Sequence, residues 1–577
     1  MLSFPVKFQA DSVSFFDRRD PDALPRWCLV GALAACAAFV RLAGLAYGLP
    51  ALFNGDEPHL IDTAVSFGRG SLDPGVFKYP TLWMYVLFAA FGVYFLLWSG
   101  LGLRRTVRDF GHLFVWHRGR FYLIGRALSA AASLAALERV YAAGRRVGPA
   151  RAGLWAAALL AASPKLVEMA HAAKPDSLML FWAAACWACA LDYLAEGRPR
   201  SLLASAGLAG LAASTQYTAL PVAGAPLLAW LLRKTSPDAA GRPSWGLGAA
   251  AAALVPAAFL AGSPYVLLDF PAFRRSMADH AVLELQRAPA GLKVLANAAS
   301  IGGPIWLCAP LLVLGYAALL RRETRVGLLL LLPPAAHVLV MMPSDMGVVF
   351  RYLAASLPAL ALAAGRGVEE AAGLLRLPLG RPAVQAALLA ALFLPGGLAS
   401  ARWSVALRRP DTRLEAAAWI DAHIPPGTRI LTGAEVDGPP LRMSKEEAER
   451  LYARTKAIGH PRARYYQLMA ESHPGGGYDV MQWSRPAGEM DTAPWHRRWS
   501  EAGWEMVDVS AGLAAARAAG AQVAVLSSSG LGLGTPSIEK FLTETAAQGR
   551  LLAEFRPEAG RVNGPTLRIY RIDGGGR

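Results

Sequence analysis

Long apolar runs dominate residues 27–400, and their lengths predict membrane-spanning helices. A helix needs about 20 mostly apolar residues to cross the hydrocarbon core of a bilayer. Candidate segments separated by polar loops lie at 27–48, 81–103, 121–143, 152–170, 177–195, 202–217, 219–232, 246–264, 302–320, 326–342, 351–365 and 383–400. The rest of the chain, 401–577, alternates short apolar runs with polar stretches, as a soluble domain does. The pattern therefore predicts an α-helical polytopic membrane domain over 1–400 and a separate soluble domain over 401–577.

The composition supports a chain that lies mostly in lipid. Of its 577 residues, 54% are hydrophobic and 17% are charged, whereas a soluble domain has about 25% charged residues. A disordered chain and a small disulfide scaffold are excluded by the same numbers. The formal net charge of +16 would suggest nucleic acid in a soluble protein. Here the basic residues recur in short tracts between apolar runs, so we expect contact with the lipid bilayer and no nucleic-acid partner.

The placement of the basic tracts predicts the orientation in the membrane. Tracts such as 145–151, 198–200 and 321–325 fall in alternate loops, and the positive-inside rule assigns them to the cytoplasm. If the N-terminus is also cytoplasmic, one apolar segment cannot cross, and we assign 81–103 as a membrane-dipping or interfacial helix pair inside one long outer loop, 49–120. This predicts about eleven spans in the plasma (inner) membrane, with a cytoplasmic N-terminus and a periplasmic or extracellular C-terminal domain.

The C-terminal domain shows helix and strand signals without a recognisable chemical motif. A helix is predicted over Asp411–His423, ended by Pro425-Pro426-Gly427. Strands are predicted at Arg429–Thr432, Ala521–Ser527 and Pro565–Ile572. A small α/β domain follows from this order.

The first motif with chemical potential is Asn54-Gly55-Asp56-Glu57-Pro58-His59, directly after the first apolar run. Proline suits the first turn of a helix, and the apolar positions that follow predict an amphipathic helix over 58–67 at the membrane surface. Asp56 would then lie at a helix N-terminus on the outer side, where the helix dipole keeps its carboxylate ionised. A simple capping role would also explain an acidic residue at this position.

Two further polar motifs are predicted on the same side. Phe77-Lys78-Tyr79-Pro80 begins the 81–103 segment, and His171-Ala-Ala-Lys174-Pro175-Asp176 precedes the span at 177–195. A lone lysine at this depth can simply reach the interface, and an aspartate beside a proline can simply cap a helix. An acidic residue at the end of a span, on the same side as Asp56, is nevertheless what a shared outer site requires.

In their order and spacing around the spans, these motifs resemble an integral-membrane glycosyltransferase of the GT-C fold. The branch is the one containing protein O-mannosyltransferases and the lipid A aminoarabinose transferase. The matching pieces are Asp56-Glu57, Lys78-Tyr79-Pro80, Arg120 to Gly148, Ser163-Pro164, Lys174-Pro175-Asp176, Gln216-Tyr217-Thr218-Ala219, Ser263-Pro264-Tyr265 with Asp269, Arg351-Tyr352 with Pro358, and Trp419-Ile-Asp with Pro426-Gly427. The resemblance implies juxtamembrane helices in the first outer loop and a polyprenyl-phosphate-linked sugar as donor. It also implies a lipid, glycan or protein acceptor and transfer on the outer face.

A sugar phosphate carries its own leaving group, so such an enzyme needs one carboxylate base and cations for the departing phosphate. We assign Asp56 as the base, with Glu57 second. Phosphate candidates are Lys78, Tyr79, Arg351 and Lys174, and candidates for orienting the acceptor are His59, His171, Asp176, Gln216 and Tyr217. Relatives often have lysine at the position of Gln216, so phosphate binding should depend more on Lys78 or Arg351. The residues indicate no certain cofactor, and a divalent cation held in part by His171 or Asp176 is compatible with them.

Three functions compete at this point. The leading one is an inverting glycosyltransferase, the alternative is a transporter or flippase of lipid-linked sugars, and the third is an inactive scaffold that presents the C-terminal domain. Transporters place polar sites near the bilayer midplane. The predicted clustering of polar motifs at the outer face favours the enzyme. The outer arginines between Arg104 and Arg120 are expected to be mostly solvated, although they face the side on which a lipid phosphate would lie.

Overall fold

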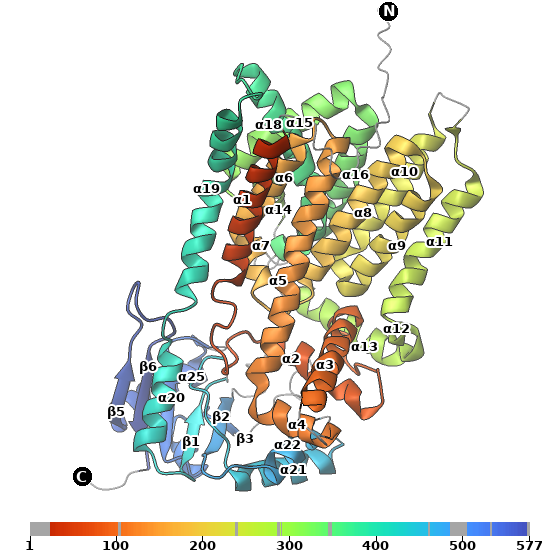
Figure 1. Ribbon diagram of the computed structural model, residues 1–577. Helices are drawn as coiled ribbons and strands as arrows, with labels where there is room; N and C mark the ends of the chain where they lie inside the picture. The colour runs from red at the N-terminus through yellow and green to blue at the C-terminus, as the bar shows by residue number, and fades with distance from the viewer. Residues whose placement is uncertain are drawn as a thin grey trace, which may run out of the picture.

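The chain consists of a helical part and an α/β part, joined at one end of the helical part (Figure 1). The computed structural model describes residues 23–101, 106–236, 241–285, 289, 291–343, 349–434, 436–459, 462–484, 505–530 and 533–573. The outer residues Arg104 and Arg105 lie outside the described ranges.

The helical part runs to residue 406 and contains α-helices and short 3-10 helices. They are α1 (Ala23–Leu42), α2 (Glu57–Ser66), η1 (Phe67–Arg69), α3 (Leu82–Leu101), α4 (Val107–Trp116), α5 (Arg118–Ala143), η2 (Gly144–Arg146), α6 (Arg151–Ala162), α7 (Pro164–Ala170), α8 (Asp176–Glu196), α9 (Pro199–Thr215), η3 (Tyr217–Ala223), α10 (Gly224–Lys234), α11 (Trp245–Gly262), α12 (Tyr265–Leu268), α13 (Phe270–Leu285), α14 (Lys293–Ser300), α15 (Ile305–Arg322), α16 (Thr324–Met341), α17 (Val349–Leu353), η5 (Ala354–Ser356), α18 (Leu357–Leu374) and α19 (Pro382–Ala406). Within the described ranges, seven helices are long and apolar enough to cross a membrane, and α1 and α6 contribute shorter apolar stretches.

Most predicted spans coincide with helices, and two of them are divided beside a proline. The predicted span 152–170 is divided into α6 and α7 at Ser163, whose hydroxyl accepts a hydrogen bond from the amide of Leu166 and caps α7. Pro164 occupies the first turn of α7, because its missing N–H is not needed there. The predicted span 219–232 similarly begins as η3, which contains Pro221, and continues as α10.

The predicted helix pair at 81–103 is one helix, α3, followed by the short amphipathic α4. By length and hydropathy α3 is one of the seven candidate spans. In Figure 1 it lies beside the end of α5 nearest the α/β part, at the level of α12 and α13. Its assignment as a non-crossing juxtamembrane helix stays a prediction.

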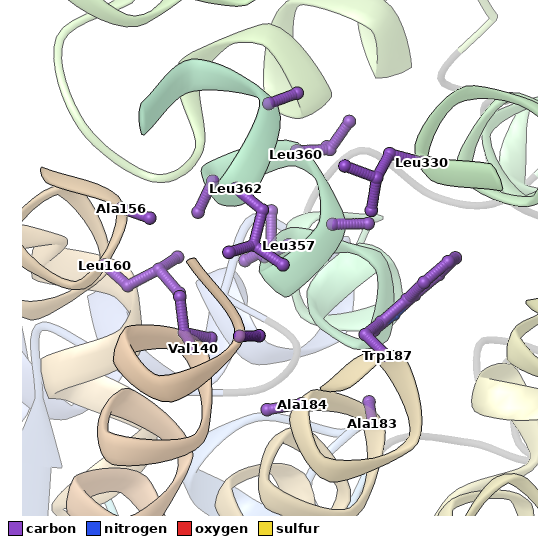
Figure 2. Packing of buried hydrophobic residues seen from close by; sticks show 14 of the residues in the cluster. Val140, Ala156, Leu160, Ala183, Ala184, Trp187, Leu330, Leu357, Leu360 and Leu362 are labelled. Carbon is purple, nitrogen blue, oxygen red and sulfur yellow. The ribbon is translucent and has the colours of Figure 1, made fainter. Parts of the chain in front are cut away.

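Aliphatic side chains form the core of the helical part. Figure 2 shows Val140 of α5, Leu160 of α6 and Leu357 of α18 close together, with the ring of Trp187 of α8 extending toward Leu330 of α16; all of these residues are buried. The indole N–H of Trp187 donates to the carbonyl of Ala355 at 3.2 Å. The one polar group of this side chain is thus satisfied inside the apolar core.

The α/β part contains a six-stranded mixed sheet. Its strands are β1 (Arg429–Thr432), β2 (Asp479–Ser484), β3 (Glu505–Asp508), β4 (Val523–Ser527), β5 (Arg550–Phe555) and β6 (Leu567–Arg571). They lie in the order β3-β2-β1-β4-β6-β5, with β3, β2, β1 and β4 parallel and β6 antiparallel to both of its neighbours. The predicted helix and all three predicted strands are present, as α20 (Thr412–His423), β1, β4 and β6.

Helices cover both faces of this sheet. Buried residues of α20 pack with one face, and those of α24 (Leu513–Ala518) and α25 (Pro536–Gln548) pack with the other. Two further helices, α21 (Lys445–Ala457) and α22 (Ala463–Glu471), lie beside α4 of the helical part (Figure 1). There the Trp116 indole donates to the hydroxyl of Ser472 at 2.9 Å, so the α/β part is docked on the first loop.

Candidate functional site

Asp56 lies at the N-terminus of α2, as predicted, but its carboxylate does not cap the helix. No side-chain cap hydrogen bond is made at this position. One carboxylate oxygen instead lies 3.0 Å from Nζ of Lys78, and the other lies 2.8 Å from Nζ of Lys174 and 3.5 Å from Nη1 of Arg351. Three cations from three distant segments therefore meet at one carboxylate. We call Asp56, Lys78, Lys174, Arg351 and their partner Asp176 the Asp56 cluster.

The neighbouring acid, Glu57, points in another direction and is fully buried. Its two oxygens accept hydrogen bonds from Nε and Nη2 of Arg126, each at 2.8 Å. One of the oxygens also accepts the backbone amide of Ala173 at 2.7 Å. Glu57 therefore joins α2 to α5 and to the loop that carries Lys174, and it positions the cluster without facing it.

The backbone on both sides of Lys78 is fixed by hydrogen bonds. The amide of Phe77 donates to the hydroxyl of Ser276 at 3.2 Å. After it, the amide of Thr81 donates to the hydroxyl of Ser263 at 3.1 Å and its hydroxyl donates to the carbonyl of Gly262 at 2.9 Å. This fixes the backbone of 77–81 against α11 and α13 while the lysine side chain reaches Asp56.

The loop that carries Lys174 is fixed by Ala173. Its amide donates to Glu57, and its carbonyl accepts the indole N–H of Trp83 at 3.1 Å. The approach to α5 requires glycine at position 125, because a Cβ there would lie 2.7 Å from the Cβ of Ala173. Contacts with α2, α3 and α5 therefore fix the backbone from which the Lys174 side chain extends.

Arg351, on α17, connects the remaining members of the site. Its Nε donates to Asp176 at 2.5 Å, and its Nη2 donates to the hydroxyl of Tyr79 at 3.1 Å. Asp176 is fully buried at the start of α8. Three positive charges thus face the two carboxylates of Asp56 and Asp176, which leaves one positive charge in excess.

The electrostatics keep Asp56 ionised. Burial would raise the pKa of its carboxyl, but Lys174, Lys78 and Arg351 outweigh burial and hold that pKa well below its usual range. Burial raises the pKa of Tyr79 above its ordinary value, so its hydroxyl stays protonated. Burial would lower the pKa of Arg351, but Asp176 and Tyr79 outweigh it and raise that pKa. In the free protein Asp56 is therefore ionised beside its three cations, and the neighbouring phenol of Tyr79 is neutral.

The remaining predicted residues lie at different distances from the cluster. The ring of His59 lies 6.4 Å from the ring of Tyr79, at the edge of the site. His171 contacts the carbonyls of Val167 and Ala43 through its two ring nitrogens and packs on Trp403. In the described ranges, no hydrogen bond joins Gln216 or Tyr217 to the cluster; both are at the end of α9 and the start of η3.

Of the three outer arginines that the structure describes, two pair with acids, and Arg120 donates to the hydroxyl of Tyr94 at 3.5 Å. Arg108 forms an ion pair with Glu471 at 2.9 Å, and Arg118 pairs with Asp62 at 3.4 Å. Over the same described ranges, no three histidine, cysteine or acidic side chains lie close enough together to hold a metal ion.

Arg126 is a residue of the site that the sequence motifs did not identify. It lies in the middle of α5, a candidate span, and is fully buried. A charged residue inside an apolar run requires a buried partner, and this was the signal that could have identified it. Its partner Glu57 comes from the outer motif, so the pair links the span directly to the helix that Asp56 begins.

Comparison with known proteins identifies the fold. Residues 122–262 match a protein-family model described as dolichyl-phosphate-mannose-protein mannosyltransferase. The chain is similar in structure to ArnT from Cupriavidus metallidurans, both bound to undecaprenyl phosphate, with a TM-score of 0.56, and in the apo state, with a TM-score of 0.57. Each likeness has 15% identity and covers 95% of this chain and 98% of ArnT.

A weaker likeness, with a TM-score of 0.45 and 11% identity, links the chain to the apo oligosaccharyltransferase of Archaeoglobus fulgidus over 87% of this chain and 69% of the other. No curated protein sequence matches the chain. The similarity to ArnT covers 95% of this chain, so it includes both the helical part and the α/β part. It confirms the GT-C fold predicted from the motifs.

Proposed function

Because the family match and the GT-C fold indicate a glycosyltransferase in the membrane, we propose that the chain transfers a sugar from a polyprenyl-phosphate-linked donor. The acceptor is a hydroxyl of a lipid, glycan or protein, and the reaction takes place at the outer face of the membrane. The observation that carries the proposal is the Asp56 cluster, in which one carboxylate is reached by two lysines and an arginine.

The charge balance of the cluster suits this substrate. Lys78 and Lys174 are long, flexible cations, and their side chains are 34% and 14% exposed. A donor phosphate brings negative charge that can take over their contacts, while Arg351 stays held by Asp176 at 2.5 Å. The undecaprenyl phosphate bound by ArnT is a ligand of the same chemical class.

Donor binding also prepares the base. In the free protein three cations hold the pKa of Asp56 far below its usual range, and such a carboxylate is a poor proton acceptor. When the donor phosphate draws Lys78 and Lys174 away, that pKa rises toward its ordinary value. Asp56 thus becomes a competent base only in the presence of donor.

The transfer step then needs no further group. Asp56 accepts the proton of the acceptor hydroxyl as its oxygen forms a bond to the anomeric carbon of the sugar. The bond from that carbon to the phosphate oxygen breaks on the opposite face, so the configuration inverts. The charge that develops on the leaving polyprenyl phosphate is stabilised by Lys78, Lys174 and Arg351, and the hydroxyl of Tyr79 holds Arg351 in place.

The α/β part contacts the segment that precedes Asp56. The guanidinium of Arg413, on α20, lies 3.4 Å from the ring centre of Phe53, and it also donates to the carbonyl of Val436 at 2.7 Å. Val436 follows β1 and lies beside Gly55, directly before Asp56. We therefore expect the loop after β1 to select the acceptor.

The test is release of polyprenyl phosphate by purified protein in lipid nanodiscs, supplied with a panel of polyprenyl-phosphate-linked sugars and total envelope lipids and glycans. Asp56→Asn should lower the release rate by about 10²- to 10⁴-fold, the usual contribution of a general base. Asp62→Asn, on the same helix and paired with Arg118 instead, is the matched control. Undiminished release by Asp56→Asn would contradict the assignment of the base.

The transporter alternative is tested by the same preparation. If the wild-type protein moves a labelled lipid-linked sugar across a vesicle membrane and releases no polyprenyl phosphate with any donor, the protein is a flippase and the transferase proposal fails.

A further inference from the structure

A cavity lies away from the Asp56 cluster, where the end of α1 meets the end of α19. Its volume is about 720 Å³, and it is a partly open hollow lined by the loop 42–48, by Leu123 of α5 and by the α19–α20 junction at 407–410 with Leu414. We call it the α1–α19 cavity. Ligand pockets commonly measure about 300–1,000 Å³, so it has the size of a ligand site.

The charged residues that line this cavity are all positive. Most of the lining is leucine, alanine and glycine, and its charged residues are Arg408 and Arg409. Among the residues that the structure describes, neither arginine forms an ion pair with a carboxylate. An apolar wall beside two uncompensated guanidinium groups is complementary to an amphiphile with an anionic head.

The position of the cavity indicates where such an amphiphile comes from. Helix α19 is a candidate span and α1 an apolar helix, and the cavity lies at the ends of both. On its walls, Leu42 is 51% exposed and Leu123 is 40% exposed. These exposed leucines give the cavity an apolar rim at the ends of two apolar helices, which a lipid of the bilayer could reach.

We propose that the α1–α19 cavity binds an anionic phospholipid. The headgroup phosphate is held by Arg408 and Arg409, and the start of an acyl chain lies along Leu42 and Leu123. Arginine suits this role because its planar fork of donors matches phosphate oxygens.

The loop that lines this cavity also supports the helix carrying Asp56. The carbonyls of Leu45 and Tyr47 accept hydrogen bonds from Nη1 of Arg126 at 3.0 and 2.8 Å. The guanidinium of Arg126 lies 4.2 Å from the ring centre of Tyr47, and it binds Glu57 through both oxygens. A lipid that orders the loop therefore orders Arg126, Glu57 and the start of α2.

Close packing at the junction makes this coupling direct. Gly44 has a positive φ of 80°, and a Cβ at this position would lie 2.5 Å from the carbonyl of Ser404 and 3.6 Å from Cγ of Arg408. The loop and α19 are thus in contact beside the phosphate-binding arginines. Lipid binding is independent of the proposed transfer reaction; its effect on turnover depends on that reaction.

The test is native mass spectrometry of the full-length protein in detergent with phosphatidylglycerol or phosphatidylcholine. Wild type should prefer phosphatidylglycerol, and the double variant Arg408→Gln/Arg409→Gln should bind it about 30-fold more weakly, because each arginine contributes a factor of about five toward an anionic lipid. The charge-matched control is Arg376→Gln/Arg381→Gln, at the other end of α19, which should bind as wild type does. A second variant, Ala46→Phe, fills the cavity without changing its charge and should also lose phosphatidylglycerol.

Two results would overturn the proposal: equal binding of the two lipids by wild type, or binding by Ala46→Phe that equals that of the control. The second decides the matter even if the arginine variant does not fold. If a variant that loses lipid binding also releases polyprenyl phosphate more slowly, the bound lipid supports the Asp56 cluster as well. If instead the base assignment fails, the lipid measurements still stand, because they involve no turnover.

Discussion

Replacing Asp56 with asparagine should tighten the binding of polyprenyl phosphate while it removes turnover. The carboxylate and the substrate phosphate compete for the same two lysines, so the carboxylate opposes binding in the free protein. Most losses of a catalytic residue weaken or leave unchanged the affinity for a ligand. An increase in affinity is therefore a specific consequence of the shared cations.

The size of the effect follows from the geometry. Nζ of Lys78 and Nζ of Lys174 lie 3.0 and 2.8 Å from the carboxylate oxygens, and a phosphate held by the same nitrogens would lie about 5 Å from the carboxylate. Two unit charges at that distance interact by about 3 kcal/mol at an effective dielectric constant near 20. Asp56 is 27% exposed, so solvent screening reduces this to about 1–2 kcal/mol. Binding should tighten about 5- to 30-fold.

The assay is titration of purified protein in nanodiscs with undecaprenyl phosphate, followed by intrinsic fluorescence or calorimetry. Asp62→Asn removes a carboxylate from the same helix but outside the cluster, and it should leave the affinity within twofold of wild type. Lys78→Met should weaken binding in both the wild-type and the Asp56→Asn background. If Asp56→Asn binds undecaprenyl phosphate less tightly than wild type does, the reasoning from shared cations is refuted.

Three further predictions follow from the same contacts. Arg126→Leu leaves a buried glutamate without its counter-ion and should lower the free energy of unfolding by about 3–5 kcal/mol, measured by thermal denaturation, whereas Arg120→Leu on the exposed side of α5 should have little effect. Lys174→Met should weaken undecaprenyl phosphate binding about tenfold, the value of one charge-assisted hydrogen bond, and Lys165→Met, exposed on α7, should not; equal effects would contradict the contact. As pH falls, kcat should decline before kcat/KM does, because the pKa of Asp56 is depressed in the free protein and rises when phosphate takes its cations. Coincident acid limbs in the two profiles would show that donor binding does not change that pKa.

The parts of the fold that the sequence predicted are those set by local patterns. Apolar runs of bilayer length became helices because a span must satisfy its backbone internally, and prolines such as Pro164 marked where a run divides. The tail helix began at Asp411, whose carboxylate accepts the amide of Arg413 at 3.0 Å and caps α20. Strands β2, β3 and β5 were not predicted; β3 and β5 are largely exposed or half-buried, so they carry weak apolar signals.

The candidate site was predictable in part for the same reason. Asp56, Lys78 and Lys174 all lie where an apolar run meets a loop on the predicted outer side, and topology alone brings such positions together. Contacts between helices that are far apart in the sequence cannot be predicted from a local sequence pattern. The pairing of Arg126 with Glu57 joins residues 69 positions apart, and it depends on how α2 packs on α5, which no window of sequence contains.

The contrast between the two adjacent acids explains which of them can act as the base. Glu57 is fully buried and makes three contacts, two with Arg126 and one with the amide of Ala173. To accept a proton it would have to break a buried ion pair, at a cost of about 3–5 kcal/mol, and nothing in the reaction offers Arg126 another partner. The lysines that hold Asp56 are partly exposed, and the donor itself supplies the phosphate that replaces the carboxylate. An acid whose counter-ions can be exchanged within the turnover can alternate between the ionised and the protonated form, and this property supports the proposal of Asp56, not Glu57, as the base.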